Sequence, residues 1–343
     1  VEKDTASVYA EWQRNKASFS TTIGTRYTHV DMDAGLAGSN MVMMNPAIAS
    51  LVDDFNAAER SKSYNMLDIA ASTRYHASDN VDVVLGVSQK NRAPTYFERY
   101  TWIPLGISGG MADGFNYIGN LALDNETARQ IDVGIDYRFK SWSVSPRLFY
   151  QDIEDYITGS PSTNMAANMV STMMAGTTPF QWTNTDAVIK GADLTVSGNV
   201  FDNVKLNAVA SVQHGNRDDI DDALFRIAPE QLITTIQWDT QLLNAPMALQ
   251  LTSELAGAQN HVSALQNETT TAGYGLVHIT GLFTLIDNAR SNLQITATVH
   301  NLFDKHYAPH TAGINRVRNT DVAVGERVPA AGREWHLSLS YRF

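Results

Sequence analysis

The chain has no cysteine among its 343 residues, which excludes a disulfide framework and any metal site built on thiolates. It also has no run of about 18 apolar residues, although 43% of its residues are hydrophobic, so no transmembrane helix is expected. The first residues, VEKDTASVYAEWQRN, have no basic region followed by an apolar stretch, and we therefore expect no signal peptide in this sequence. Positive charge is scarce as well. The formal net charge of −11 argues against nucleic acid as a partner.

In place of long apolar runs, the chain has apolar residues at alternate positions. In the last eleven residues, REWHLSLSYRF, these are Trp335, Leu337, Leu339, Tyr341 and Phe343. A period of two predicts a β-strand with one apolar and one polar face. We find thirteen such segments: 4–14, 17–30, 65–76, 81–91, 126–139, 142–157, 183–198, 203–214, 228–239, 246–257, 274–285, 291–301 and 333–343. The chain is therefore predicted to be all-β.

The connections between these segments are short and long in strict alternation. The long ones are 31–64, 92–125, 158–182, 215–227, 258–273 and 302–332. A soluble β-sandwich has no reason to sort its loops in this way, and it would partition to water without detergent. A bacterial outer-membrane barrel does sort them, with tight turns in the periplasm and long loops outside. We therefore predict a transmembrane β-barrel with a polar interior.

The number of strands bears on how much of a barrel is present. Complete bacterial barrels have an even number of strands, and thirteen is odd. Thirteen isolated strands would also leave two open edges in lipid, where unpaired backbone groups are very costly. We therefore expect residues 1–343 to be the C-terminal part of a larger barrel.

Three stretches resemble one family, the TonB-dependent outer-membrane receptors. The ending VHNLFDKHYAPH, followed by GREWHLSLSYRF, is similar to the family's penultimate strand, long loop and final strand with a terminal Phe. SQKNRAPTYFERY, followed by GGMADGFNYIGNLALDNETARQIDVGIDYRF, is similar to its R-x-P-x-x-x-E and L-x-x-E region. NTDAVIKGADLTVSG is similar to its strand with a central K/R-G-x-E/D-L. The resemblance covers essentially the whole chain.

The resemblance implies a fold and a function. The fold would be the C-terminal portion of an antiparallel barrel of about 22 strands with a plugged lumen. The plug domain and the segment that contacts TonB would be absent from this chain. The function would be TonB-dependent active import of a scarce nutrient, namely a metal ion, a metal chelate or a siderophore. The implied partners are TonB, through the plug, and outer-membrane lipid and lipopolysaccharide, with Phe343 read by the assembly machinery.

Two other classes of barrel fit the same pattern. A passive porin-like channel and a surface adhesion or structural barrel would have similar strands, and an upstream plug domain would separate them from an importer. We find no Ser/His/Asp order, no phosphate-binding glycine motif and no supported carboxylate pair, so we expect neither an enzyme nor a cofactor.

Methionine is concentrated in the predicted external loops. Nine of the eleven methionines lie there, including Met32 and Met111. Thioethers favour Cu(I), and methionines four positions apart share one face of a helix. The alternative is that these flexible apolar side chains pack the loops or form part of an apolar ligand-binding surface. The candidate metal ligands are Met41, Met43, Met44, Met165, Met169, Met173, Met174 and His310.

Aromatic and basic residues crowd one external region around the two long motifs. They are suited to an aromatic platform for a siderophore, or equally to bracing and packing the loop. The candidate ligand-binding residues are Arg92, Tyr96, Phe97, Arg99, Tyr100, Trp102, Phe115 and Tyr117.

Two weaker patterns concern hard or borderline metal ions. The loop NRDDIDD carries Asp218, Asp219, Asp221 and Asp222, which suit Ca²⁺, although the spacing is not that of an EF-hand. His306 and His310 have metal-compatible spacing only in a helix.

Overall fold

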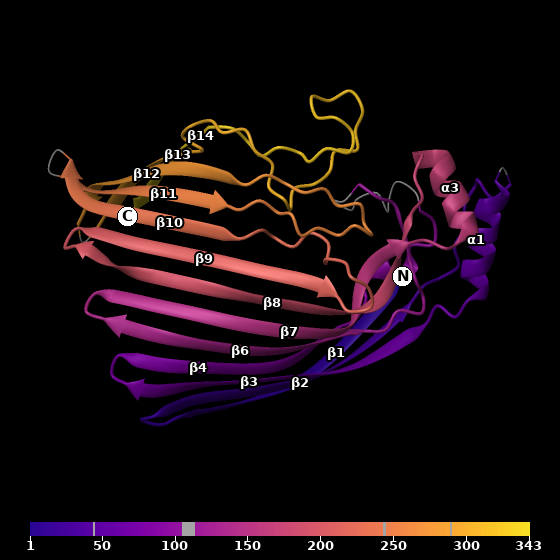
Figure 1. The fold of residues 1–343 in the computed structure, drawn as a ribbon, viewed down its shortest axis with the longest axis horizontal. Helices are drawn as coiled ribbons and strands as arrows, with labels where there is room; N and C mark the ends of the chain where they lie inside the picture. Colours follow the sequence, from indigo (N-terminus) through magenta and orange to yellow (C-terminus); the bar gives the residue numbers. More distant parts are fainter. Residues whose placement is uncertain (44, 105–113, 243–244, 289) are drawn as a thin grey trace.

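The computed structural model describes the chain except residues 44, 105–113, 243–244 and 289. The described residues form one curved antiparallel sheet, drawn in Figure 1, in which thirteen strands follow one another in chain order. A two-residue strand, β5, lies off this path and pairs in parallel with β8. The predicted all-β fold is confirmed. In the described part of the chain, β1 and β14 are the two ends of the strand order and do not pair with each other.

The sheet of the described residues has fourteen strands. They are β1 (Glu2–Asn15), β2 (Phe19–Asp33), β3 (Lys62–Ser78), β4 (Val81–Arg92), β5 (Tyr117–Ile118), β6 (Glu126–Phe139), β7 (Trp142–Pro161), β8 (Phe180–Phe201), β9 (Val204–Arg217), β10 (Gln231–Leu242), β11 (Ala245–Ala256), β12 (Tyr274–Asp287), β13 (Asn292–His300) and β14 (Glu334–Arg342). The helices are α1 (Pro46–Ala57), α2 (Tyr96–Tyr100) and α3 (Met165–Ala175). None of these described helices is long and apolar enough to cross a membrane.

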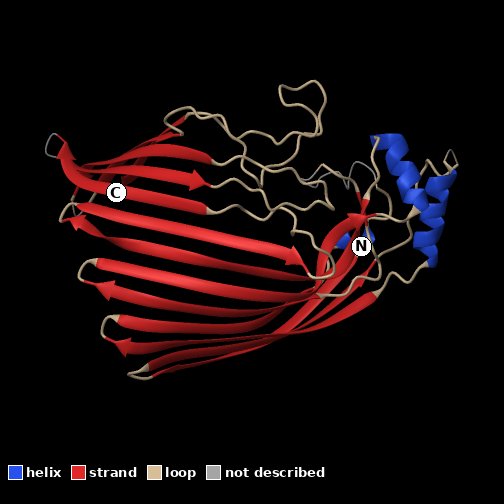
Figure 2. Ribbon diagram, viewed as in Figure 1, coloured by secondary structure: helices blue, strands red, loops and turns tan. Residues whose placement is uncertain are grey.

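The predicted sorting of the connections is visible in Figure 2. Tight turns gather at one end of the sheet, and the long loops with all described helices gather at the other end. We call these the turn end and the loop end. In an outer-membrane barrel they correspond to the periplasmic and external sides.

The two faces of the sheet differ in chemistry, as the alternation predicts. On β14, the side chains of Trp335 and Leu337 are 74% and 79% exposed. The opposite face carries cross-strand hydroxyl pairs, such as Thr235 with Thr252 at 3.0 Å and Thr280 with Thr298 at 3.1 Å. An apolar face this open to its surroundings is stable in lipid, and the polar face then lines the lumen.

Buried residues concentrate at the loop end. One cluster joins the end of β2 and the start of β3 to α2, with Val30, Met32, Tyr64, Met66 and Tyr100. Another joins α1 to α3. Among the described residues, the thin sheet between lipid and lumen has no comparable core, so packing energy is concentrated where the external loops meet.

Several sequence-based details are corrected by the structure. The strands β7 and β8 are longer than predicted at the loop end. β7 continues to Pro161 and β8 begins at Phe180, because these two strands remain paired up to those residues. Met32, predicted in an external loop, belongs to β2 and is 1% exposed. The helices and β5 were not predicted, since tertiary packing inside the loops stabilises them.

Candidate functional site

An ionic brace explains why the two long motifs lie where they do. Arg92, the last residue of β4, donates to Glu126 at the start of β6 from Nε and Nη2, at 2.6 and 2.7 Å. Its Nη1 donates to Glu98 on α2 at 2.9 and 3.1 Å. Glu98 also closes a capping box with Thr95, which starts this short helix. The arginine and both glutamates of the motifs therefore form one contact.

Arg99 and Tyr100 lie inside the same loop. Arg99 is 1% exposed, and it donates to the hydroxyl of Tyr64 at 2.9 Å and to the carbonyl of Arg60 at 3.2 Å. Its guanidinium also lies 5.2 Å from the ring of Tyr100. These two predicted ligand residues anchor the loop over the ends of β2 and β3.

The predicted aromatic residues separate into three places. Tyr96 and Phe97 are exposed and their rings are 4.3 Å apart. Trp102 packs against the cluster that joins α1 and α3. Phe115 and Tyr117 join an aromatic group with residues that sequence reasoning missed: Tyr117 stacks on Trp182 at 4.5 Å, and Phe115 meets Phe180 edge-on at 4.7 Å.

A cavity of about 390 Å³ connects the brace to this aromatic group. Its lining includes Arg92, Tyr117, Trp182, Arg226 and Gln266. The size is within the range of small-molecule sites. Of the eight predicted ligand residues, Arg92 and Tyr117 line this cavity. Trp182, Arg226 and Gln266 carried no motif that pointed to them, because they come from β8 and from the loops after β9 and β11.

The methionines of α3 form an exposed surface. The helix begins at the cap Asn164, whose side chain accepts from the Ala167 amide, and it ends at Gly176 with φ of 73°. Ala167 and Val170 are buried against Ile48 and Leu51 of α1. The opposite face presents three methionines four positions apart, which are Met165, Met169 and Met173, exposed by 81%, 65% and 62%.

The structure brings the second methionine-rich segment to this helix. Asn45, the cap of α1, has its Nδ2 4.0 Å from the sulfur of Met173, and both residues line an open cavity of about 490 Å³. Met43 is 97% exposed, and Met41 packs partly against the cluster that joins α1 and α3. Met174 is half exposed, and Met44 lies outside the described residues. We call Met41, Met43, Met165, Met169, Met173 and Met174 the methionine surface.

His310 does not contact the methionine surface. It is 2% exposed, its Nε2 lies 2.9 Å from Glu268, and its Nδ1 lies 3.0 Å from the Thr271 hydroxyl. Burial raises the pKa of Glu268. Hydrogen bonds from His310 and from two backbone amides together lower the pKa by more than burial raises it, so the net pKa lies below the ordinary value. His310 thus ties two external loops together.

The other metal patterns are also used for loop contacts. Asp219 pairs with Arg217 at 2.6 Å, and this hydrogen bond lowers the pKa of Asp219 to about 2. Asp222 accepts from the Ser263 hydroxyl at 2.6 Å and the Ala264 amide at 2.7 Å. His306 and His310 lie in non-helical chain. Among the described residues, no group of three or more His, Asp or Glu is arranged to hold a metal.

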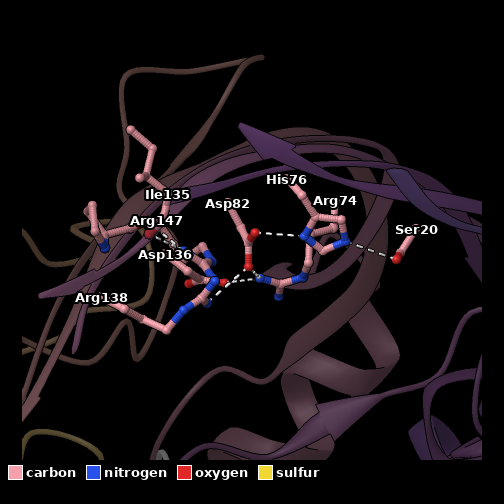
Figure 3. Close-up of polar contacts among 9 residues, drawn as sticks. Ser20, Arg74, His76, Asp82, Ile135, Asp136, Arg138 and Arg147 are labelled. Carbon is pink, nitrogen blue, oxygen red and sulfur yellow. Dashed lines mark hydrogen bonds and ion pairs between the residues drawn. The ribbon is translucent and has the colours of Figure 1, made fainter. Parts of the chain in front are cut away.

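A charged network lies on the polar face near the turn end (Figure 3). Asp82 accepts from Arg138 at 3.0 Å and Arg74 at 3.1 Å, and it lies 2.7 Å from His76 Nδ1. Arg74 also pairs with Asp136, which in turn pairs with Arg147. The side chain of Arg147 lies against Gly134, where a Cβ would clash with it and force it to move. These strands are thereby linked on the lumen side.

A family model matches most of the chain. Residues 1–302 match the model described as TonB dependent receptor-like, beta-barrel. No curated protein matches the chain in sequence.

Solved structures with a similar fold include three transporters or receptors. The copper transporter OprC has a TM-score of 0.76 and 19% identity, over 98% of this chain and 47% of that one. The FrpB iron transporter from Neisseria meningitidis (F3-3 variant) has a TM-score of 0.67 and 14% identity, over 99% and 45%. The ferric yersiniabactin uptake receptor FyuA from Yersinia pestis has a TM-score of 0.62 and 13% identity, over 99% and 45%. The chain spans less than half the length of each.

Proposed function

Because the chain belongs to the family of TonB-dependent receptor-like β-barrels, we propose that it forms barrel wall of a receptor that actively imports a scarce metal-containing nutrient. Membership places the chain among outer-membrane proteins, and the family is one of receptors and transporters. The fold supports import because a polar lumen face and external loops with cavities are what a gated channel requires.

In the proposed receptor, TonB would act on this part of the barrel wall through a plug domain. The matched structures are about twice as long as this chain, which leaves room for a plug and the remaining strands in a full receptor. We propose that TonB acts on the plug and not on the residues described here. Outer-membrane lipid and lipopolysaccharide would contact the apolar face, which includes Trp335 and Leu337.

For the cargo, the observation that favours one metal is the methionine surface. Apolar side chains usually pack inward, yet Met43, Met165, Met169 and Met173 are 62% to 97% exposed at the loop end. Their thioethers are soft ligands that favour Cu(I). We propose that this surface collects copper before import. His310 is not part of it, since Glu268 and Thr271 hold its ring.

The test compares copper uptake by the full-length receptor in cells with and without TonB. Changing Met41, Met43, Met44, Met165, Met169, Met173 and Met174 together to Leu keeps volume and apolarity and removes the sulfur. We expect at least a tenfold loss of TonB-dependent copper uptake at limiting copper. The matched control is Met66→Leu, which alters a methionine buried in β3. Unchanged copper uptake in the septuple variant would discard the copper cargo, and uptake without TonB would favour a passive channel.

A further inference from the structure

The described methionines at the loop end occupy two opposite environments. Met165, Met169 and Met173 on α3 are the exposed group, at 62% to 81%. Met32 on β2 and Met66 on β3 are only 1% and 6% exposed. Oxidation of a thioether needs access to the sulfur, and it converts an apolar side chain into a polar sulfoxide. The helix α3 therefore presents three oxidisable sulfurs on one face, on the external side of the sheet.

The packing of α3 lies on the face opposite these sulfurs. Figure 1 shows α3 beside α1 at the loop end, and Ala167 and Val170 are fully buried in the cluster that joins the two helices. Ile48 and Leu51 are the residues of α1 that meet them. A polar oxygen added to the methionine face would therefore leave the apolar contact between α1 and α3 in place.

One side chain is placed to bind an oxidised sulfur. The Oδ1 of Asn45 caps α1 by accepting from the Ala47 amide at 3.0 Å, while its Nδ2 lies 4.0 Å from the sulfur of Met173. A thioether sulfur is a weak acceptor, so this contact contributes little in the reduced protein. An oxygen bonded to that sulfur would lie closer to the amide, at the distance of an ordinary hydrogen bond.

The open cavity of about 490 Å³ gives room for such an oxygen. Its lining consists of Asn45, Asn168, Met169, Thr172 and Met173, so three polar side chains surround two of the sulfurs. A small oxidant can enter an open cavity, and the sulfoxide oxygens would meet polar groups there instead of an apolar core. The cavity therefore suits the oxidised side chains as well as the reduced ones.

We propose that Met165, Met169 and Met173 form a modification site, at which oxidation to sulfoxides switches off the capture of a soft metal ion. A hydroperoxide transfers one oxygen to each sulfur. The O–O bond breaks, an S–O bond forms, the sulfur loses two electrons, and the peroxide leaves as water or an alcohol. The oxidised sulfur is no longer a soft thioether ligand.

The Asn45 amide then donates to the sulfoxide oxygen of Met173, which keeps α1 and α3 together in the oxidised state. The loss of metal capture rests on the proposed copper cargo, because it removes the ligands of that cargo. The modification itself rests only on the exposure of the sulfurs and on the contact with Asn45.

The first measurement maps oxidation in the purified full-length receptor in detergent. Dilute hydrogen peroxide is added, and peptide mass spectrometry follows the gain of one oxygen at each methionine. We expect Met165, Met169 and Met173 to react at least about tenfold faster than the buried Met32 and Met66, which serve as internal controls. Equal rates in the exposed and the buried group would overturn the modification site.

The second measurement titrates silver(I), a soft ion that stands in for Cu(I), before and after oxidation. The affinity should fall at least about tenfold on oxidation. It should return after treatment with both classes of methionine sulfoxide reductase and a dithiol, which restore the thioethers. Silver binding that survives oxidation would overturn the switch and leave the copper cargo standing. No silver binding before oxidation would overturn the copper cargo and the switch together, and the oxidation map would then decide the modification site alone.

The role of Asn45 is tested with Asn45→Asp, which keeps an oxygen that caps the helix and removes the N–H donor. Asn45→Ser is the second variant, since it keeps a capping oxygen without adding charge. Oxidation should slow hydrogen exchange in α1 and α3 of the wild type by about twofold to tenfold, the range for one net hydrogen bond, and should not slow it in either variant. The same response in all three proteins would overturn the hydrogen bond to the sulfoxide.

Discussion

Arg92 shows how residues far apart in the sequence become one contact. The sequence pattern singled it out as a ligand candidate or a loop brace, and the structure gives it both glutamates of the two motifs as partners. Glu98 and Glu126 have side chains only 12% and 13% exposed, whereas Arg92 is 41% exposed. The arginine is thus the solvent-facing member that donates hydrogen bonds to two poorly hydrated carboxylates.

Arg92→Lys should loosen the loop between β4 and β6, because a single ammonium cannot donate to both carboxylates in the bidentate geometry. We expect a loss of about 1–2 kcal/mol in local stability, discounted for the exposure of Arg92. Limited proteolysis of residues 93–125 in the full-length receptor measures it. The control is Arg129→Lys, which alters an exposed pair with Glu154 on the same sheet. Equal cleavage of both variants would contradict the brace.

Long loops behave as packed elements in this chain. α1 and α3 belong to different connections, yet they bury Ile48, Leu51, Ala167 and Val170 against one another. The loops after β11 and β13 meet at Glu268 and His310. The external surface is therefore a layer with its own core, and its cavities exist because the loops support each other.

The cysteine-free chain allows a direct test of the contact between α1 and α3. With Asn45→Cys and Met173→Cys together, a short bifunctional thiol reagent should crosslink the two residues, whose side chains are 4.0 Å apart. Asn45→Cys with Met165→Cys is the control, because Met165 lies about 12 Å further along the helix. Equal crosslinking in both pairs would mean that α3 does not hold this position.

The contact at Glu268 should make the loop layer sensitive to acid. The folded pKa of Glu268 lies below its ordinary value, so its stabilising contribution is complete above the unfolded pKa, about 4.5. It is lost as the pH falls through the lower folded pKa. Hydrogen exchange in the loops 257–273 and 301–333 should therefore accelerate below about pH 4.5. In Glu268→Gln this step should be absent; its persistence would assign the change to another group.

The sheet was predictable from the sequence and the loop layer was not. Alternation along REWHLSLSYRF reports the chemistry of two faces, one in lipid and one in the lumen, and that signal is local. The contacts of Tyr117 with Trp182 and of Asn45 with Met173, and the cavity lining that includes Arg226, join segments that are far apart in the sequence. No periodic pattern encodes them, so site residues such as Trp182, Arg226 and Gln266 were missed.

On the scale of the whole molecule, stability depends on the two edges of the open sheet. β1 pairs with β2 and β14 with β13, and the described residues do not join the two edges. Exposed edges in lipid leave backbone groups without partners, and exposed edges in water invite aggregation. We therefore propose that the wall becomes stable only when further strands pair with these two edges.

Expressed alone, residues 1–343 should fail to give the compact, heat-resistant band on detergent gels that is typical of closed barrels. The full-length receptor should give it, and both should need detergent to stay in solution. A soluble, monomeric chain without detergent would contradict the membrane assignment.

Chain-order pairing has a consequence for how the wall assembles. Apart from β5, each strand joins only its neighbours along the chain, so no step of folding has to bring together segments separated by more than one loop. Closure entropy rises slowly with loop length, and local pairing is fast relative to distant pairing. The sheet can therefore form by sequential addition of hairpins, in which each strand already in place pairs with the next strand along the chain. The external loop layer would form last, after the strands that carry it are in place.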